Sequence, residues 1–172
     1  MPIFHSQIAA QAKSPDGKIV QVPPATALQL RGPILQVSLT IEQNAGKGLL
    51  AKGQTVPTPR SGLALIDTGA SNTCVDEQTA KDLGLPIIDV ANMQSASHEK
   101  HSCNVYPVQI ITPIVTLNAP RPMGAALASQ GLLVLIGRDV LQNCNLFYNG
   151  PAGQFTLSLE RLLISHSLVP SA

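Results

Sequence analysis

Hydrophobic residues occur along the chain in short runs that are separated by glycine, proline and polar residues. Residues 33–41 alternate imperfectly between hydrophobic and polar positions, which is typical of a half-buried strand. Residues 63–66 and 131–137 are almost wholly apolar, as in short buried strands. Residues 145–159 predict a hairpin with its turn at 149–153. The pattern therefore predicts an all-β domain.

Two segments have the composition of short helices. Asp76 is a suitable N-cap for a helix that begins after it and stops at Gly84, with Pro86 just beyond. Residues 138–144 predict one or two further helical turns directly after the apolar strand 131–137. The predicted fold is thus all-β with one or two short helices.

The remaining segments are expected to connect these elements. Residues 44–62 are rich in glycine, lysine and proline and predict a long, mobile hairpin connection. Residues 87–112 hold two β-type segments around a polar centre, as in a protruding hairpin. Residues 113–130 predict a loop with at most one strand.

The expected organisation is one domain with an extension at each end. We predict an N-terminal extension over residues 1–31, which contains a turn at 14–18 and a β-like piece, a domain over 32–160, and a C-terminal tail over 161–172. A chain of 172 residues can bury an ordinary core but cannot hold two catalytic lobes.

Composition excludes several classes of partner. The 11 Lys and Arg against 10 Asp and Glu give a formal charge of +1, and no basic run suggests nucleic acid. No segment approaches the ~18 uninterrupted apolar residues of a membrane span, and the start does not have the pattern of a signal peptide. We therefore expect a soluble, unexported protein with no nucleic-acid or membrane partner.

The cysteines indicate a reducing compartment. Cys74, Cys103 and Cys144 are odd in number, widely spaced and in no metal-ligand pattern, which argues against a disulfide framework and a zinc site. Small, half-buried free thiols are the expected alternative. We expect a cytoplasmic location, with no metal and no cofactor.

One carboxylate stands at an unusual place in this pattern. Asp67 follows the apolar run 63–66 and precedes a turn that contains Gly69. An ionisable group at the end of a buried strand is costly unless it is hydrogen-bonded or functional. An ordinary helix-cap or turn aspartate is the alternative to a catalytic one.

The residues around Asp67 resemble a known active-site signature. The segment ALIDTGAS, residues 64–71, resembles that of the aspartic proteases, and LIGRDVL, residues 135–141, resembles their second element. Together the two segments are similar to those of the retropepsin-like aspartic proteases, and the likeness in the order of elements covers roughly residues 33–159.

The resemblance implies an acid-protease barrel with its active site on a homodimer two-fold axis. It implies an aspartic endopeptidase that acts on peptide or protein substrates, with Asp67, Thr68 and Gly69 as the catalytic turn. The chemistry agrees, because adding water to a peptide carbonyl needs one group that takes a proton from water and another that gives a proton to the carbonyl oxygen, and two carboxylates that share one proton do both. Since the chain has a single Asp-Thr-Gly, the second carboxylate must come from another copy.

The chain departs from many retroviral members in two places. Ser71 stands where they carry an Asp that pairs with the later Arg, which is present here as Arg138. Arg138 is left to bond turn carbonyls, to pair with Asp139 or the partner chain, or to lie in solvent. The second departure is the predicted hairpin, which has no glycine between Gln94 and Asn104.

The candidate substrate-binding residues come from the turn, from the centre of the predicted hairpin and from the second element. They are Ala70, Ser71, His98, Glu99, Ile136 and Gly137. Aliphatic pocket walls are candidates at Leu65, Ile111, Val134 and Ile136, for which a place in the buried core is the alternative. The alternative functions are a non-catalytic dimeric module that binds peptides or partners and a precursor blocked by its N-terminal residues.

Overall fold

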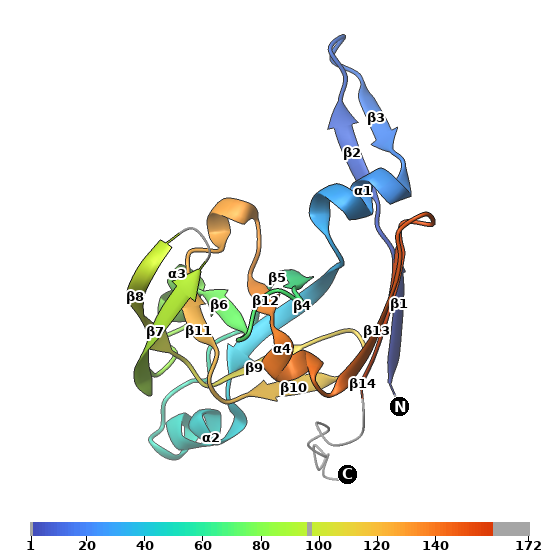
Figure 1. The fold of residues 1–172 in the computed structure, drawn as a ribbon. Helices are drawn as coiled ribbons and strands as arrows, with labels where there is room; N and C mark the ends of the chain where they lie inside the picture. The colour runs from blue at the N-terminus through green and yellow to red at the C-terminus, as the bar shows by residue number, and fades with distance from the viewer. Residues whose placement is uncertain (1, 96–97, 160–172) are drawn as a thin grey trace.

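The structure is a computed structural model that describes residues 2–95 and 98–159, with the side chains of residues 93–101 outside this description. Its strands form sheets of nine, three and two strands (Figure 1). The order in the large sheet is β10-β9-β4-β5-β12-β6-β11-β8-β7, and in the small ones β1-β14-β13 and β2-β3. The strands are β1 (Ile3–Gln7), β2 (Ala10–Lys13), β3 (Ile19–Val22), β4 (Ile34–Ile41), β5 (Arg60–Ile66), β6 (Cys74–Asp76), β7 (Asp89–Ser95), β8 (His98–Val105), β9 (Val108–Ile111), β10 (Thr116–Ala119), β11 (Met123–Ala125), β12 (Val134–Ile136), β13 (Cys144–Asn149) and β14 (Gln154–Leu159).

The centre of the large sheet brings the two signature segments together. β5 pairs in parallel with β12, and the register places Ile66 opposite Ile136. Each of these residues is followed by its signature turn, so Asp67 and Gly137 lie at the same end of the sheet. The core is aliphatic around these strands, since Ala64, Ile66 and Ile136 are all buried. The predicted all-β class is confirmed.

Five short helical segments accompany the strands in the described residues. The helix predicted after Asp76 is α3 (Glu77–Asp82), and its N-cap is Asp76, as expected. The helix predicted after Gly137 is α4 (Arg138–Leu141). The others are α1 (Pro24–Arg31), α2 (Gln43–Ala51) and the 3-10 turn η1 (Ala128–Gln130).

The hairpin connection predicted over residues 44–62 joins the antiparallel strands β4 and β5, but the prediction missed the helix within it. Helix α2 occupies its first half, and β5 begins near its end. Glu42 explains why a helix forms despite two internal glycines, because its carboxylate accepts hydrogen bonds from the backbone N–H groups of Asn44 and Ala45 at 2.8 and 3.1 Å. Such an N-cap satisfies donors that a helix start otherwise leaves unpaired.

The prediction of at most one strand over residues 113–130 was also wrong, since both β10 and β11 lie there. β11 is only three residues long and pairs with β6 on one side and β8 on the other. A strand this short has no readable alternation, which explains why the sequence pattern did not reveal it. The protruding hairpin expected over 87–112 is present as β7 and β8.

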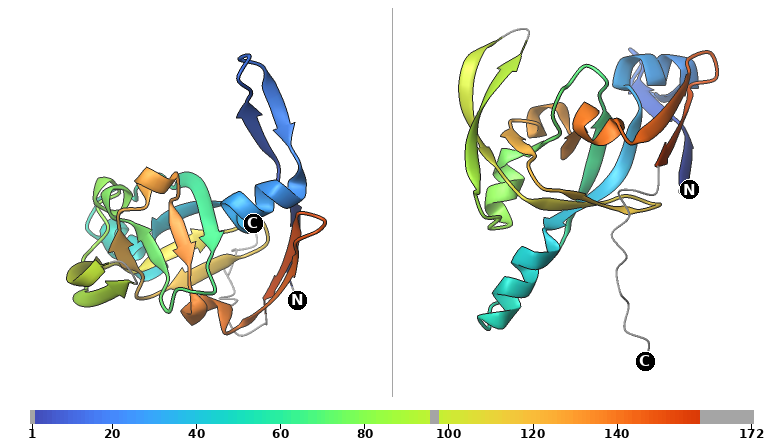
Figure 2. Two further views of the ribbon diagram at one scale, coloured as in Figure 1. Left: turned by 45° about the horizontal axis from the view of Figure 1, so that its top comes forward. Right: turned by 60° about the horizontal axis from the view of Figure 1, so that its bottom comes forward.

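The predicted N-terminal extension contributes a strand to the folded domain. β1 pairs along its whole length with β14, from Ile3 opposite Ser158 to Gln7 opposite Gln154. The ring centroids of Phe4 and Phe155 lie 5.8 Å apart beneath this pairing. The hairpin of β2 and β3 follows and projects away from the body, as Figures 1 and 2 show. The predicted turn at residues 14–18 joins these two strands.

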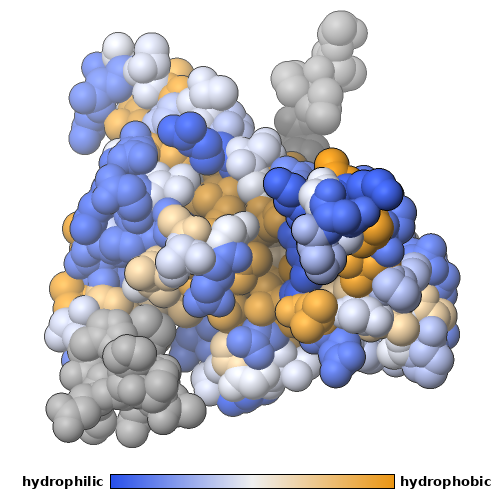
Figure 3. Space-filling view, turned by 90° about the horizontal axis from the view of Figure 1, so that it is seen from above, coloured by the Kyte–Doolittle hydropathy of each residue, from blue (hydrophilic) through white to orange (hydrophobic). Residues whose placement is uncertain are grey.

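The surface mixes apolar and hydrophilic side chains. On the face seen from above in Figure 1, apolar groups gather in the middle between hydrophilic groups on either side (Figure 3). Among the residues that the structure describes, no helix is long and apolar enough to cross a membrane.

Candidate active site

Strand β5 delivers Asp67 to the surface at the end of the sheet. The backbone N–H of Asp67 donates to the carbonyl of Ile136 at 2.9 Å, which extends the parallel pairing of β5 and β12 by one residue. Asp67 is half-buried, whereas the next two residues, Thr68 and Gly69, are exposed. The carboxylate therefore stands where the buried strand meets solvent.

Backbone amides of the turn hold the Asp67 carboxylate. Oδ1 accepts hydrogen bonds from the N–H of Gly69 at 2.8 Å and from the N–H of Ala70 at 3.3 Å. A Cβ atom on Gly69 would lie 3.1 Å from Oδ1, so glycine allows the closest approach of backbone and carboxylate. Oδ2 takes part in neither bond, which leaves this oxygen directed away from the turn amides.

Arg138 at the start of α4 fixes the other side of the turn. Its guanidinium donates to the carbonyls of Thr68 and Gly69, both at 2.8 Å, and to Oγ of Ser71 at 2.7 Å. Its backbone N–H donates to the carbonyl of Ala70 at 3.0 Å. Of the alternatives left open for Arg138, bonding to turn carbonyls is the one that the structure shows. Ser71 keeps a contact to this arginine in place of the ion pair.

Gly137 lets the two signature segments touch through their backbones. A Cβ atom on Gly137 would lie 2.5 Å from both the carbonyl carbon and the carbonyl oxygen of Asn72, so a larger residue could not be placed here without moving the turn. Gly137 N–H donates to Oγ1 of Thr73 at 3.1 Å. The second element thus packs directly against the backbone that continues the Asp67 turn, at Asn72 and Thr73.

Thr73 and Asp139 complete this support, and the sequence analysis missed the role of both. Thr73 is fully buried and donates through its hydroxyl to Oδ1 of Asp139 at 2.8 Å, while its backbone N–H donates to Oδ2 at 3.0 Å. The only sequence signal was an Asp in the first turn of a predicted helix, a position that usually interacts with its own helix. Nothing in the spacing of 66 residues indicates the contact with Thr73.

The predicted substrate-binding residues occupy different environments. Ala70 and Ser71 belong to the turn itself, whereas Ile136 is 1% exposed and lies in the core beneath it. The side chains of His98 and Glu99 lie outside the described residues, although both belong to strand β8. Of the suggested pocket walls, Val134 is fully buried in the core, Leu65 is half-buried and Ile111 is 36% exposed.

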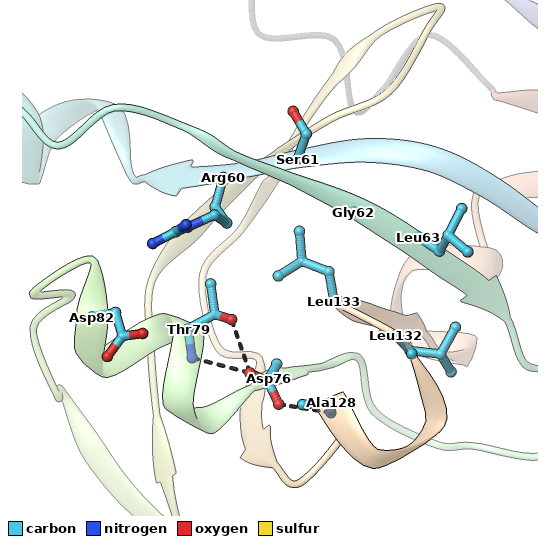
Figure 4. A pocket seen from close by; sticks show the side chains of 11 residues that line it. Arg60, Ser61, Gly62, Leu63, Asp76, Thr79, Asp82, Ala128, Leu132 and Leu133 are labelled. Carbon is cyan, nitrogen blue, oxygen red and sulfur yellow. Dashed lines mark hydrogen bonds between the residues drawn. The ribbon is translucent and has the colours of Figure 1, made fainter.

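Asp76 connects the start of α3 to the loop at residues 127–128 through four hydrogen bonds. Its Oδ2 accepts from the N–H and hydroxyl of Thr79 at 3.0 and 2.8 Å, and its Oδ1 accepts from the N–H groups of Leu127 and Ala128 at 3.2 and 3.0 Å (Figure 4). Burial by itself raises the pKa of Asp76, but these bonds outweigh burial and leave the pKa below its usual value. The carboxylate thus caps α3 and also anchors the loop that leads into β12.

Asp76 lies beside a shallow pocket that does not include Asp67. The pocket has a volume of about 340 Å³ and is lined by the start of β5, by α3 and by the loop after η1 (Figure 4). Among the described residues, no group of three or more His, Cys, Asp or Glu side chains could hold a metal ion. The groups that meet at the Asp67 turn are a carboxylate and the backbone amides that donate to it.

Comparisons with known proteins find one similar family model and a similar solved structure. No curated protein sequence matches the chain. A crystal structure of a retropepsin-like aspartic protease from Rickettsia conorii is similar, with 13% sequence identity, 90% of each chain covered and a TM-score of 0.42. The family model described as aspartyl protease matches residues 47–121, which contain the Asp67 turn and the β7–β8 hairpin. The resemblance to aspartic proteases predicted from the sequence is confirmed by the match of this family model to residues 47–121.

Proposed function

We propose that the chain is an aspartic endopeptidase that cleaves peptides or proteins as a homodimer. The observation that supports this most strongly is the geometry of Asp67, whose Oδ1 is held by two backbone amides while Oδ2 takes part in neither bond. An aspartate that only capped a turn would need neither the hydrogen bonds from Arg138 to the turn nor the close contact between Gly137 and the backbone of Asn72.

Hydrolysis in this scheme uses two copies of Asp67. One carboxylate takes a proton from water as the water attacks the peptide carbonyl, and the other gives a proton to the carbonyl oxygen. Two carboxyl groups held this close cannot both ionise, so the pair shares one proton over an acidic to near-neutral window. Oδ1 remains fixed by Gly69 and Ala70 during the reaction, which keeps the carboxylates oriented.

The second copy is required because the chain supplies one such turn. A two-fold axis that passes beside Asp67 brings identical turns face to face, as in isologous dimers generally. Thr68 is exposed next to Asp67, and in the proposed dimer it would contact the partner's turn. The substrate would lie extended across the axis, with the β7–β8 hairpin of each subunit over it, and would bind by strand addition.

Cleavage of a mixed peptide library across acidic to neutral pH tests this proposal. We expect cuts that an inhibitor mimicking the tetrahedral intermediate abolishes, that metal chelators leave unchanged, and that are absent in Asp67→Asn. Asp82→Asn is the matched control, because Asp82 is an exposed carboxylate on α3 outside the turn. If Asp67→Asn cleaves at the normal rate, Asp67 is not the catalytic residue.

Dilution tests the requirement for a dimer. Specific activity should fall as the protein is diluted through the dimer dissociation constant measured by sedimentation, because a monomer holds half a site. Specific activity that stays constant where only monomer sediments would contradict the shared site. A stable dimer that binds peptides without inhibitor-sensitive cleavage would instead favour the binding module.

A further inference from the structure

A carboxylate that peptide hydrolysis does not use holds the root of the β7–β8 hairpin. Glu77, the first residue of α3, reaches across to the end of β8. Its Oε1 accepts hydrogen bonds from Nδ2 of Asn104 at 2.8 Å and from the hydroxyl of Tyr106 at 2.9 Å. Nζ of Lys81 lies 3.1 Å from the same oxygen. Three donors from two elements therefore converge on one atom.

The second oxygen of the Glu77 carboxylate is buried against β11. Oε2 of Glu77 is buried and has no hydrogen-bond partner among the described residues. It lies against Gly124 of β11, where a Cβ atom would be 1.6 Å from Oε2. A buried, unpaired carboxylate oxygen costs free energy. The position of Glu77 must therefore be maintained by the bonds that Oε1 makes to β8 and its continuation at Tyr106.

The hairpin depends on these bonds because its attachment to the sheet is slight. Within the described ranges 2–95 and 98–159, β7 is the edge strand and pairs only with β8, and β8 pairs with β11 through the single residue pair Val105 and Met123. One further backbone bond, from the N–H of Tyr106 to the carbonyl of Pro122 at 3.0 Å, lies just beyond. Arg121 also pairs with Asp89 at the start of β7, but both side chains are exposed, and an exposed ion pair contributes little. Figures 1 and 2 show the hairpin standing out from the body above this root.

We propose that Glu77 is a positioning residue that fixes the root of the β7–β8 hairpin and so sets how often the hairpin opens. The charge of Glu77 is central, since a carboxylate binds neutral donors more strongly than an amide does. Burial by itself raises the pKa of Glu77, but the bonds from Asn104, Lys81 and Tyr106 outweigh burial and keep the pKa below its usual value. The role in substrate binding rests on the proposed function, whereas the mechanical role does not.

Amide hydrogen exchange of the free protein tests the mechanical role. In Glu77→Gln we expect exchange to become about tenfold faster in residues 89–95 and 98–105, because charge-assisted bonds are replaced by neutral ones. Residues 144–159, which form β13, β14 and their turn, serve as the internal reference and should change less than about twofold. Asp82→Asn is the matched control and should change the hairpin less than about twofold, because Asp82 is an exposed carboxylate of the same helix and accepts its hydrogen bond from Gln78 within α3.

Tyr106→Phe provides a milder variant and a second readout. Cys103 in β8 is 7% exposed and its thiol donates to the carbonyl of Ala91 at 3.3 Å, so a thiol reagent reaches it only when the hairpin opens. Glu77 remains charged in this variant, so its effect on the pKa of the Cys103 thiol is retained. We expect alkylation of Cys103 to rise about threefold relative to Cys144, as measured by peptide mass spectrometry.

The outcomes separate this proposal from a general effect on stability. Faster exchange confined to the hairpin in Glu77→Gln, with selective Cys103 alkylation in Tyr106→Phe, supports it. Unchanged hairpin exchange overturns it, and so does a rise of equal size in residues 144–159, because Glu77 would then stabilise the whole fold. If the protein cleaves peptides, Glu77→Gln should raise KM about fivefold with kcat within about twofold. If it cleaves none, the exchange result still stands by itself.

Discussion

Replacing Asp76, the N-cap of α3, with alanine is expected to destabilise the protein more than replacing Asp82, a carboxylate within that helix. Asp76 is 4% exposed and accepts four hydrogen bonds, two from Thr79 and one each from the N–H groups of Leu127 and Ala128. Loss of the N-cap costs about 1 kcal/mol, and each N–H group left unpaired in the loop costs about 1 kcal/mol at the low end of the usual range. The low end applies because the neighbouring pocket admits water. The expected loss is about 3 kcal/mol.

Urea denaturation at pH 7 measures this loss as a lower midpoint with an unchanged slope. The matched control is Asp82→Ala in the same helix, where an exposed side chain predicts a change within about 0.5 kcal/mol. The folded pKa of Asp76 lies below its value in the unfolded chain, so its stabilisation is complete above the unfolded pKa. It is lost as the pH falls through the folded pKa. An Asp76→Ala midpoint equal to that of the wild type would refute the assignment of these four bonds.

Three further predictions concern the turn, the thiols and the N-terminal strand. Gly137→Ala should lower the free energy of unfolding by about 2 kcal/mol or more, because its Cβ would collide with the Asn72 carbonyl. In the control Gly48→Ala in α2, the new Cβ meets no atom within 4 Å, so thermal melting should show a neutral or stabilising change. Burial raises the pKa of Cys74 and of Cys144 to about 11, so at pH 8 only about 0.1% of each is thiolate and alkylation should quicken about tenfold per pH unit. Deleting residues 1–9 removes β1 and the buried Ile8 and should cost about 3 kcal/mol in urea denaturation; an unchanged midpoint would show that β1 does not stabilise the fold.

The sequence predicted the parts of the fold that local chemistry determines. β5, β12 and the hairpin of β13 and β14 follow from apolar runs and from glycine-rich turns, and α3 follows from its Asp76 cap. The local sequence of each of these segments favours the structure that it adopts, so short-range patterns reveal them. The Asp67 turn belongs to the same class, because its own residues, Gly69 and Ala70, supply the amides that hold the carboxylate.

Other features depend on contacts between distant residues and could not be predicted from the pattern. Helix α2 contains Gly46 and Gly48, which disfavour helices, and it relies on the cap at Glu42. β11 exists because β6 and β8 offer it partners on both sides. Asp139 looked like a residue of its own helix, whereas it holds Thr73, 66 positions away in the sequence. Long-range pairing of this kind leaves no periodic signal along the chain.

The support of the Asp67 turn also bears on how a dimer would assemble. Gly69, Ala70 and the Arg138 guanidinium hold the turn through hydrogen bonds that need no second subunit. Under the proposed function, each half of the site is therefore formed before the subunits meet. Association would then require little ordering of the turns themselves, which lowers the free-energy cost of forming the dimer. For the same reason we expect Asp67→Asn to keep both the fold and the dimer while removing cleavage, since the side-chain amide oxygen that this substitution introduces can still accept from the turn amides.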